Sequence, residues 1–477
     1  MKITVHLVVC DDDGHEETVT EVVILEKACQ RIEQVGLTLA EAKVLLTGLQ
    51  QRIVERQIAS FLATRRHCQV CGQALRTKGH HSLTLRTLFG TIALNSVRLR
   101  QCACTPDETA TFSPLTQLLS EPTAPELLLM ETKWASLVSY GLTAQALKDV
   151  LPVDETLSVS TVRTNALAVA QRCEAELGDE QMSFIEGCPR DWGHLPILDG
   201  PITVGIDGGY GRDWDAKKGH FEVIVGKSML AFKREDEEDI PSSQCVGVVQ
   251  TFDMKPKRRL FEVLQSQGHQ LNQHMTVLSD GGDTVRDLQW YLSPEAEHPL
   301  DWFHLAMRLT VLQQTAKGLP LTVQDEADTY VLRDAVVREL ERLKWFLWHG
   351  NVYRAGQVVQ SVEMDLDVAA ALGDRIARKL LRAIEEFHTY IENNQGFIPN
   401  DGERYRQGER ISTGVVESTV NQVVSRRFCK KQPMQWTKRA AHLLLQMRVK
   451  TLNHELATVF RRWYPNFPVQ QGEAQAA

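Results

Sequence analysis

The chain has 477 residues, more than a single hydrophobic core usually holds, so roughly two to four domains are expected. Its 43% hydrophobic and 24% charged residues are ordinary for a soluble globular protein, and no apolar run approaches the roughly 18 residues that would span a bilayer. The net charge of −8 argues against a protein that simply coats nucleic acid. The first residues lack the order of a signal peptide, which predicts a cytoplasmic protein.

Positive charge is concentrated in two stretches. Residues 51–100 contain nine lysines and arginines against one acid, and six cations with no acid lie between Arg426 and Arg439. Such patches on an acidic chain suit a protein that binds a polyanion at chosen surfaces, although a solvated face explains either patch equally well. Ten cysteines in a reducing compartment indicate metal binding or burial rather than disulfides.

The first elements expected are two strands and a helix. Residues 2–26 have the composition of a hairpin that turns at Asp13–Gly14, and residues 27–64 have apolar side chains at helical spacing.

The next segment contains four cysteines in two pairs. Cys68 and Cys71 form a C-x2-C pair followed by a glycine, and Cys102 and Cys104 form a C-x-C pair after two β-rich stretches. Four thiolates meet the tetrahedral demand of structural zinc, and strands between the pairs predict a zinc ribbon. The tighter second pair leaves the fourth ligand open among Cys104 and the histidines at 67, 80 and 81, and four buried free cysteines are the simpler alternative.

Residues 126–177 have the pattern of helices, with a break at Gly141 and Ser158 or Ser160 capping the last helix. Short polar side chains and Arg163 lead that last helix, which outlines a helix-turn-helix with a recognition helix for DNA. An ordinary packed bundle explains the same pattern about as well.

From residue 200 the pattern changes to strands. They are expected at "ITVGID", "HFEVIVGKSMLAF", "CVGVVQTF", "HMTVLSD" and "PLDWFH", with a helix over 255–267. Amphipathic helix follows over about 322–395, then a link rich in glycine and asparagine, and then a helix at "GVVESTVNQVVSRRF".

Three acidic residues are candidate metal ligands, two at expected strand ends and one on an expected helix. Asp207 is interpreted as ending one strand and Asp280 as ending another, each followed by glycines, and Glu417 lies on the last helix beside a stripe of valines. Two aspartates and a glutamate are the minimum that holds a pair of Mg²⁺ ions about 3.5–4 Å apart for phosphodiester chemistry. The glycines after Asp207 would then leave room for a phosphate backbone.

Each acid alone has a simpler explanation. An Asp before Gly-Gly is most often a turn residue, and a helical Glu is usually solvated. Other acids nearby compete as ligands, namely Asp213, Asp215, Asp283 and Asp287. The metal interpretation therefore depends on its combination with the ribbon and the two basic stretches.

Five motifs together are similar to those of a known family: the paired cysteines, "GIDGGYGR", "LSDGGDTVRDL", "LDWFHLAMR" and "ISTGVVESTVNQVVSRRF". Over roughly residues 60 to 455 the chain resembles bacterial insertion-sequence transposases of the ISKra type, which are DDE transposases. The resemblance implies an α/β multidomain fold, in which a zinc ribbon and a helical, helix-turn-helix-like domain precede an RNase H-like mixed sheet with an all-α insertion. The implied divisions are 1–64 for the N-terminal hairpin and helices, 65–110 for the ribbon, 122–190 for the helical domain, 198–310 and 401–460 for the core, 311–400 for the insertion and 461–477 for a tail.

The resemblance also implies roles for single residues. It matches Asp207 and Asp280 to the two family aspartates and Glu417 to the closing glutamate, which would bind Mg²⁺ or Mn²⁺. Asp301 and His304 of "DWFH" would support them near the scissile strand. From the charge and helix patterns, and not from the resemblance, the residues expected to contact DNA are Arg163, Arg426, Arg427, Lys430 and Lys431.

The implied activity is metal-assisted hydrolysis at the ends of an insertion sequence, followed by attack of the freed 3′-OH on target DNA. The expected partners are the terminal inverted repeats, the target DNA and a second copy of the chain, in a nucleoid-associated protein with no membrane contact. Two alternatives stay open. One is a non-catalytic zinc-ribbon DNA-binding regulator, and the other is a sugar-kinase-like ATPase, whose phosphate loop would want Thr or Ser where Tyr210 stands.

Overall fold

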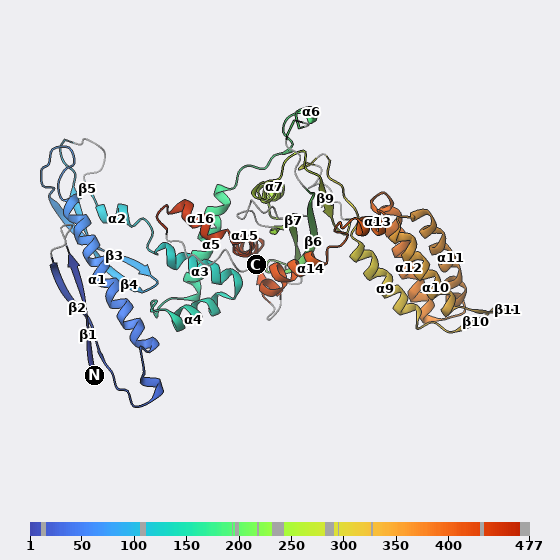
Figure 1. The fold of residues 1–477 in the computed structure, drawn as a ribbon, viewed down its shortest axis with the longest axis horizontal. Coiled ribbons are helices and arrows are strands. Elements are labelled where there is room, and N and C mark those ends of the chain that lie inside the picture. Colours follow the sequence, from blue (N-terminus) through green and yellow to red (C-terminus); the bar gives the residue numbers. More distant parts are fainter. Residues whose placement is uncertain are drawn as a thin grey trace. The chain divides into compact units, whose positions relative to one another are not determined.

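The computed structural model describes residues 1–10, 16–104, 111–192, 194–195, 200–216, 219–230, 243–281, 291–293, 295–325, 328–429 and 434–467. The chain divides into two compact units, Met1–Cys173 with His454–Ala477, and Glu174–Asn453. Both mix helices and strands (Figure 1). None of the helices in these ranges is long and apolar enough to cross a membrane.

The first unit begins with the predicted hairpin, in which β1 (Lys2–Cys10) pairs antiparallel with β2 (Glu16–Glu26). The expected turn at Asp13–Gly14 lies outside the described residues. The helix α1 runs over Leu39–Arg65, so its predicted start at residue 27 is wrong. A capping box fixes the true start, because the Thr38 hydroxyl accepts from the N–H of Glu41 and the Glu41 carboxylate accepts from the N–H of Thr38.

The predicted ribbon strands follow. β3 (Thr77–Thr87) and β4 (Gly90–Arg100) form an antiparallel pair, and β5 (Thr111–Phe112) adds to the edge of β4 before the short helix α2 (Pro114–Leu118). Alternate residues of β4 are buried, which places Ile92 and Leu94 in a small core with Val54 of α1 and Leu115 of α2.

The helical part of this unit contains α3 (Pro125–Leu137), α4 (Tyr140–Val150), α5 (Val159–Glu176) and, from the C-terminal segment, α16 (Leu456–Trp463). The break between α3 and α4 falls at Val138, so the predicted break at Gly141 is wrong. Ser139 caps α4 by accepting from the N–H of Leu142. Ser158 precedes α5 and accepts from the N–H of Thr161, as one of the two predicted caps.

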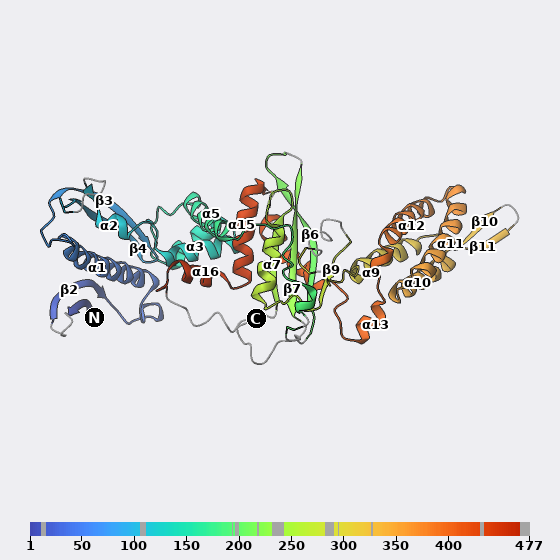
Figure 2. The ribbon, with the colours of Figure 1, turned by 90° about the horizontal axis from the view of Figure 1, so that it is seen from above.

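The second unit contains a five-stranded mixed sheet (Figure 2). Three strands are antiparallel neighbours, β6 (Ile202–Asp213), β7 (His220–Leu230) and β8 (Ser243–Val249). After helix α7 (Pro256–Ser266), β9 (Met275–Leu278) pairs parallel with the first half of β6, and β12 (Gln435–Trp436) pairs parallel with its end. Single parallel bridges from Thr276 to Glu297 and from Ser279 to Leu300 continue the sheet beyond β9.

The predicted strand "PLDWFH" is wrong beyond Leu300. Asp301 caps helix α9 (Trp302–Ala316) by accepting from the N–H of Phe303, so "WFH" is the first turn of a helix.

The insertion is mostly helical, and α9, α10 (Arg333–Trp348), α11 (Val352–Ala371) and α12 (Arg375–Asn393) share one core of leucines and valines. A hairpin of β10 (Thr322–Asp325) and β11 (Asp328–Val331) interrupts it, where helix was predicted. The predicted link contains a 3-10 turn (Gln395–Phe397) and helix α13 (Asp401–Arg406). The chain then forms α14 (Gly414–Val420), the π-helix η3 (Asn421–Cys429) and α15 (Lys438–Leu452).

Candidate active site

Asp207 lies in the middle of β6, so its predicted place at a strand end is wrong. The ladder with β7 continues past it, pairing Asp207 with Val225 and Gly211 with Phe221. Strand residues alternate between faces, and Val204 and Ile206 point into the core beneath α7. Asp207 therefore shares the opposite face of the sheet with Gly205 and Gly209.

Gly205 and Gly209 of β6 make room for a helix, so Gly209 does not leave the space for a phosphate backbone that was expected. A Cβ on Gly208 would instead meet Glu222, and one on Gly211 would meet Phe221. A Cβ on Gly205 would lie 2.3 Å from Val416 Cγ2, and one on Gly209 would lie 3.1 Å from Val420 Cγ1 and 3.3 Å from Val424 Cγ1. Valines four residues apart on the helix thus meet glycines four residues apart on the strand. Because Glu417 follows Val416, this contact brings Glu417 to the same face as Asp207.

This contact predicts a stability change for a small substitution. Gly205→Ala is expected to destabilise the fold by about 1–3 kcal/mol, because the added methyl overlaps Val416 in a buried contact. Gly356→Ala is the matched control, since a Cβ there meets nothing within 4 Å inside α11, and it is expected to stabilise by about 0.5–1 kcal/mol. Denaturant unfolding of both variants measures the difference, and a Gly205→Ala protein as stable as wild type would contradict the close contact.

Asp280 lies just beyond the strand that is parallel to β6. β9 ends at Leu278, opposite Gly205, and Asp280 follows two residues later, close enough for its charge to raise the pKa of Asp207. The chain turns there through Gly281, whose φ of +91° and close approach to Asn394 suit only glycine. The Tyr390 hydroxyl donates to the Asp280 carbonyl over 2.9 Å.

Asp301 connects the insertion to the helix that carries Glu417. Its fully buried carboxylate accepts from the N–H groups of Phe303 (3.0 Å) and Thr413 (2.9 Å), from the Thr413 hydroxyl, and from His304 Nδ1 (2.9 Å). Burial alone would raise the pKa of Asp301, but these hydrogen bonds outweigh it and hold the pKa below its ordinary value. Asp301 is therefore an ionised anchor at the start of α14.

The charges of this region act on one another. We call Asp207, Asp280, Asp301, Glu417 and His304 the acidic cluster. Burial raises the pKa of Asp207, and the charges of Asp280 and Asp301 raise it further. The hydrogen bond from the Gly208 N–H and the charge of His304 lower it in part. Burial likewise raises the pKa of Glu417, with Asp207 as the next cause. The hydrogen bond to Asp301 raises the pKa of His304, and the charges of Asp207 and Asp280 add to this. The sequence-predicted acids are thus electrostatic neighbours.

The four predicted zinc ligands are gathered more tightly. The sulfurs of Cys68 and Cys104 are 3.3 Å apart and those of Cys71 and Cys102 are 3.5 Å apart. Gly72, with a φ of +71°, closes the turn between the first pair, and its N–H donates to the Cys68 carbonyl. All four ligand atoms lie within 4.8 Å of one another, close enough to bind a metal such as zinc. In the described part of the chain this is the only such group of three or more, so the acidic cluster is more widely spaced.

The sequence was also compared with known proteins. No family model matches the chain, and no curated protein matches it in sequence. Its functional interpretation therefore depends on the residues themselves.

The predicted DNA contacts differ in their exposure. Arg163 is exposed near the start of α5, and Arg426 is exposed on the π-helix. Arg427 does not fit the prediction, because it is only 3% exposed and its guanidinium lies 5.2 Å from the ring centroid of Trp436. Lys430 and Lys431 lie outside the described residues.

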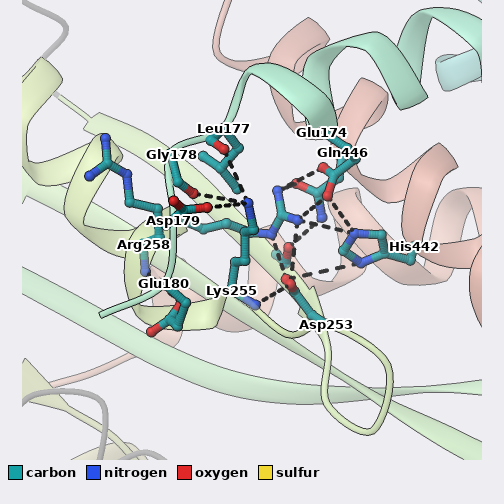
Figure 3. A network of polar contacts seen from close by, with 12 residues as sticks. Glu174, Leu177, Gly178, Asp179, Glu180, Asp253, Lys255, Arg258, His442 and Gln446 are labelled. Carbon is teal, nitrogen blue, oxygen red and sulfur yellow. Dashed lines mark hydrogen bonds and ion pairs between the residues drawn. The ribbon is translucent and has the colours of Figure 1, made fainter. Parts of the chain in front are cut away.

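A buried ion-pair cluster holds the helices around the sheet (Figure 3). Arg259 of α7 pairs with Asp253 and with Glu174 at the end of α5, and it also contacts His442 (3.1 Å) and Gln446 (3.1 Å) of α15. Burial opposes the ionised form of Glu174, but His442 and Arg259 lower its pKa to about 2. The cluster therefore fixes α15 against α7, and sequence reasoning missed all of its members because they are far apart in the chain.

The buried carboxyl group of Asp401 is expected to make the stability of the fold depend on pH. Asp401 is 1% exposed, its Oδ2 has no hydrogen-bond partner among the described residues, and burial raises its pKa to about 7. A raised folded pKa means that stability falls as pH rises from about 4 to about 7. Asp401→Asn is expected to match wild type near pH 4 and to exceed it by about 2 kcal/mol at pH 8. Urea unfolding at both pH values checks this, and an equal difference at both would contradict it.

Proposed function

We propose that the chain is a DNA transposase of the DDE type, which cleaves DNA at insertion-sequence ends and transfers the freed strand into target DNA. Asp207, Asp280 and Glu417 are its proposed catalytic acids. The observation that carries the proposal is their convergence: Asp207 lies on β6, Asp280 follows the parallel strand β9, and Glu417 lies on the helix that packs against Gly205 and Gly209. Random placement of solvated acids would not produce this packing.

The sheet supports an RNase H-like core for this proposal. Three antiparallel strands, β6, β7 and β8, are followed by α7 and by β9, which returns parallel to β6. The helices that interrupt the core between Asp280 and Glu417 suit the expected insertion, although the β10–β11 hairpin departs from an all-helical one.

The acidic cluster fits divalent cations by its chemistry. Burial and neighbouring negative charges raise the pKa of Asp207 and Glu417, so a positive charge there would relieve both penalties. Asp207, Asp280 and Glu417 would hold Mg²⁺ or Mn²⁺. When bound, the metal would activate the attacking oxygen and stabilise the leaving oxygen of a phosphodiester.

The other residues of the cluster orient these acids. Asp301 holds Thr413 at the start of α14 and so fixes the helix that carries Glu417. His304 is held through Nδ1 by Asp301, and this hydrogen bond and the charges of Asp207 and Asp280 raise its pKa, which favours the protonated form. In the proposed reaction the positive charge of that form would attract the phosphate of the scissile strand.

The N-terminal unit would supply DNA binding. The four-cysteine site, which zinc would occupy, holds together a ribbon flanked by basic residues, and the exposed Arg163 leads α5. A second copy of the chain would be needed to hold two DNA ends together.

The proposal is tested by incubating the purified protein with the DNA that flanks its gene, in Mg²⁺ or Mn²⁺. Cleavage at the borders of an inverted repeat is the expected result, and it should disappear with EDTA. Binding of that DNA without cleavage would instead favour the alternative, a zinc-ribbon DNA-binding regulator, which the four-cysteine site would equally serve. For the ATPase alternative, Gly208, Gly209 and Gly211 lie within a paired strand rather than in a loop. Its other motif, "SDGGD", extends beyond the described residues.

A further inference from the structure

The helix that carries Glu417 changes type one residue after α14 ends. Residues Asn421–Cys429 form a π-helix, in which each N–H bonds to the carbonyl five residues earlier. Such segments are rare and often occur at functional sites, because the wider turn alters the direction of the side chains that follow. Something in the surrounding structure must therefore hold this turn in place.

Arg448 of α15 contacts the π-helix at its second residue. Its Nε donates to the Gln422 carbonyl over 3.1 Å, and its Nη2 donates to the same oxygen. Arg448 is only 3% exposed, and burial lowers its pKa to about 10. The positive charges of Arg427 and Arg426 lower the pKa further. Burying a cation near two others destabilises the fold unless hydrogen bonds compensate, and here Arg448 donates two to the Gln422 carbonyl.

Arg448 can act as a fixed support because α15 is itself anchored. Gln446 donates to the Gly247 carbonyl of β8 over 2.9 Å, and His442 lies 3.2 Å from Glu174 in the cluster of Figure 3. Residues of α15 from Ala440 to Val449 are buried throughout. The helix therefore presents Arg448 to Gln422 from a rigid position on the sheet.

Glu417 lies between two such supports. Asp301 holds Thr413, four residues before Glu417, and Arg448 holds Gln422, five residues after it. Between them Val416 and Val420 fit against Gly205 and Gly209. The position of the carboxylate along β6 is thus fixed from both ends.

We propose that Arg448 is a positioning residue for Glu417, which holds the junction of α14 and the π-helix so that this carboxylate stays beside Asp207 for metal binding. The inference rests on the proposed function, because it assumes that the acidic cluster binds divalent cations. Residues that orient metal ligands typically change metal affinity by about 10–100-fold when they are replaced.

The test is the dissociation constant of Mn²⁺, measured by calorimetry on the full chain without DNA. Arg448→Met keeps the length and burial of the side chain but removes its donors, and its Mn²⁺ affinity is expected to fall at least about tenfold. Arg448→Lys keeps the charge and one donor group, and an intermediate affinity is expected. Arg338→Met, an arginine with a 73% exposed side chain on α10, is the control and should bind as wild type does.

The outcomes distinguish the positioning role of Arg448 from metal binding by the acidic cluster. Weaker Mn²⁺ binding in Arg448→Met, with circular dichroism showing a folded protein, supports the positioning role, since a merely structural role would lower thermal stability and leave affinity unchanged. Wild-type affinity in Arg448→Met, while Asp207→Asn and Glu417→Gln bind weakly, overturns the inference alone. Wild-type affinity in all three overturns the metal site itself. Where Arg448→Met does not fold, Arg448→Lys carries the test, and wild-type affinity in that variant overturns the inference.

Discussion

Replacing Asp207 with Asn is expected to abolish Mg²⁺-dependent cleavage of the element ends, by about a thousandfold or more, while binding of those ends remains. Asn keeps the size of the side chain but cannot supply a carboxylate to a cation. The matched control is Asp215→Asn, an exposed acid shortly after the same strand, which should cleave as wild type does. Single-turnover cleavage and a gel-shift assay on the same DNA measure the two properties separately.

The same variant should be more stable than wild type when no divalent cation is present. Burial and the charges of Asp280 and Asp301 raise the pKa of Asp207, so its ionised form opposes folding at neutral pH, and the amide removes that penalty. Added Mn²⁺ should then raise the melting temperature of wild type but not that of Asp207→Asn. Cleavage at the wild-type rate, or an equal response to Mn²⁺, would remove Asp207 from the site.

The second large effect concerns the ribbon. About one zinc per chain should co-purify with wild type, and the double variant Cys68→Ser/Cys71→Ser should lose it, because four thiolates within 4.8 Å form the site. Structural zinc is worth about 10 kcal/mol or more to small domains, so β3 and β4 should lose their protection from hydrogen exchange. The control, Cys29→Ser/Cys188→Ser, changes two exposed cysteines outside the site and should retain the metal. A stably folded, metal-free wild-type ribbon would contradict this expectation.

Local patterns in the sequence were sufficient to predict much of the fold. Alternating apolar residues indicated β3, β4, β7 and β8, and the cysteine spacing indicated a four-sulfur cluster that the structure brings together. The helix boundaries at Thr38 and Val138 were less predictable, since each depends on a capping or turn geometry of a few residues.

Predictions failed where a distant segment decides the local structure. Gly208, Gly209 and Gly211 suggested a break, yet pairing with β7 carries β6 through all three. Gly209 makes room for the valines of the helical segment that begins at Gly414, some two hundred residues later in the chain. Arg427 belongs to a basic stretch that suggested an exposed patch, but its guanidinium packs against the Trp436 ring.

The acids of the candidate site were predicted from sequence, but the residues that contact their helix and strand were not. Asp207, Asp280 and Glu417 stand beside glycines or valines that mark them, whereas Thr413 and Arg448 have ordinary neighbours in the sequence. One signal was available: the four-residue spacing of Gly205 and Gly209 matches that of Val416 and Val420, and a small-to-large match of this kind indicates close packing of strand and helix.

The most direct test of the convergent acids is diffraction from crystals soaked in Mn²⁺, with data collected at a wavelength where manganese scatters anomalously. The account predicts an anomalous peak within about 2–2.5 Å of carboxylate oxygens from Asp207, Asp280 and Glu417 together. Manganese bound elsewhere, with these three side chains sharing no ion, would contradict it.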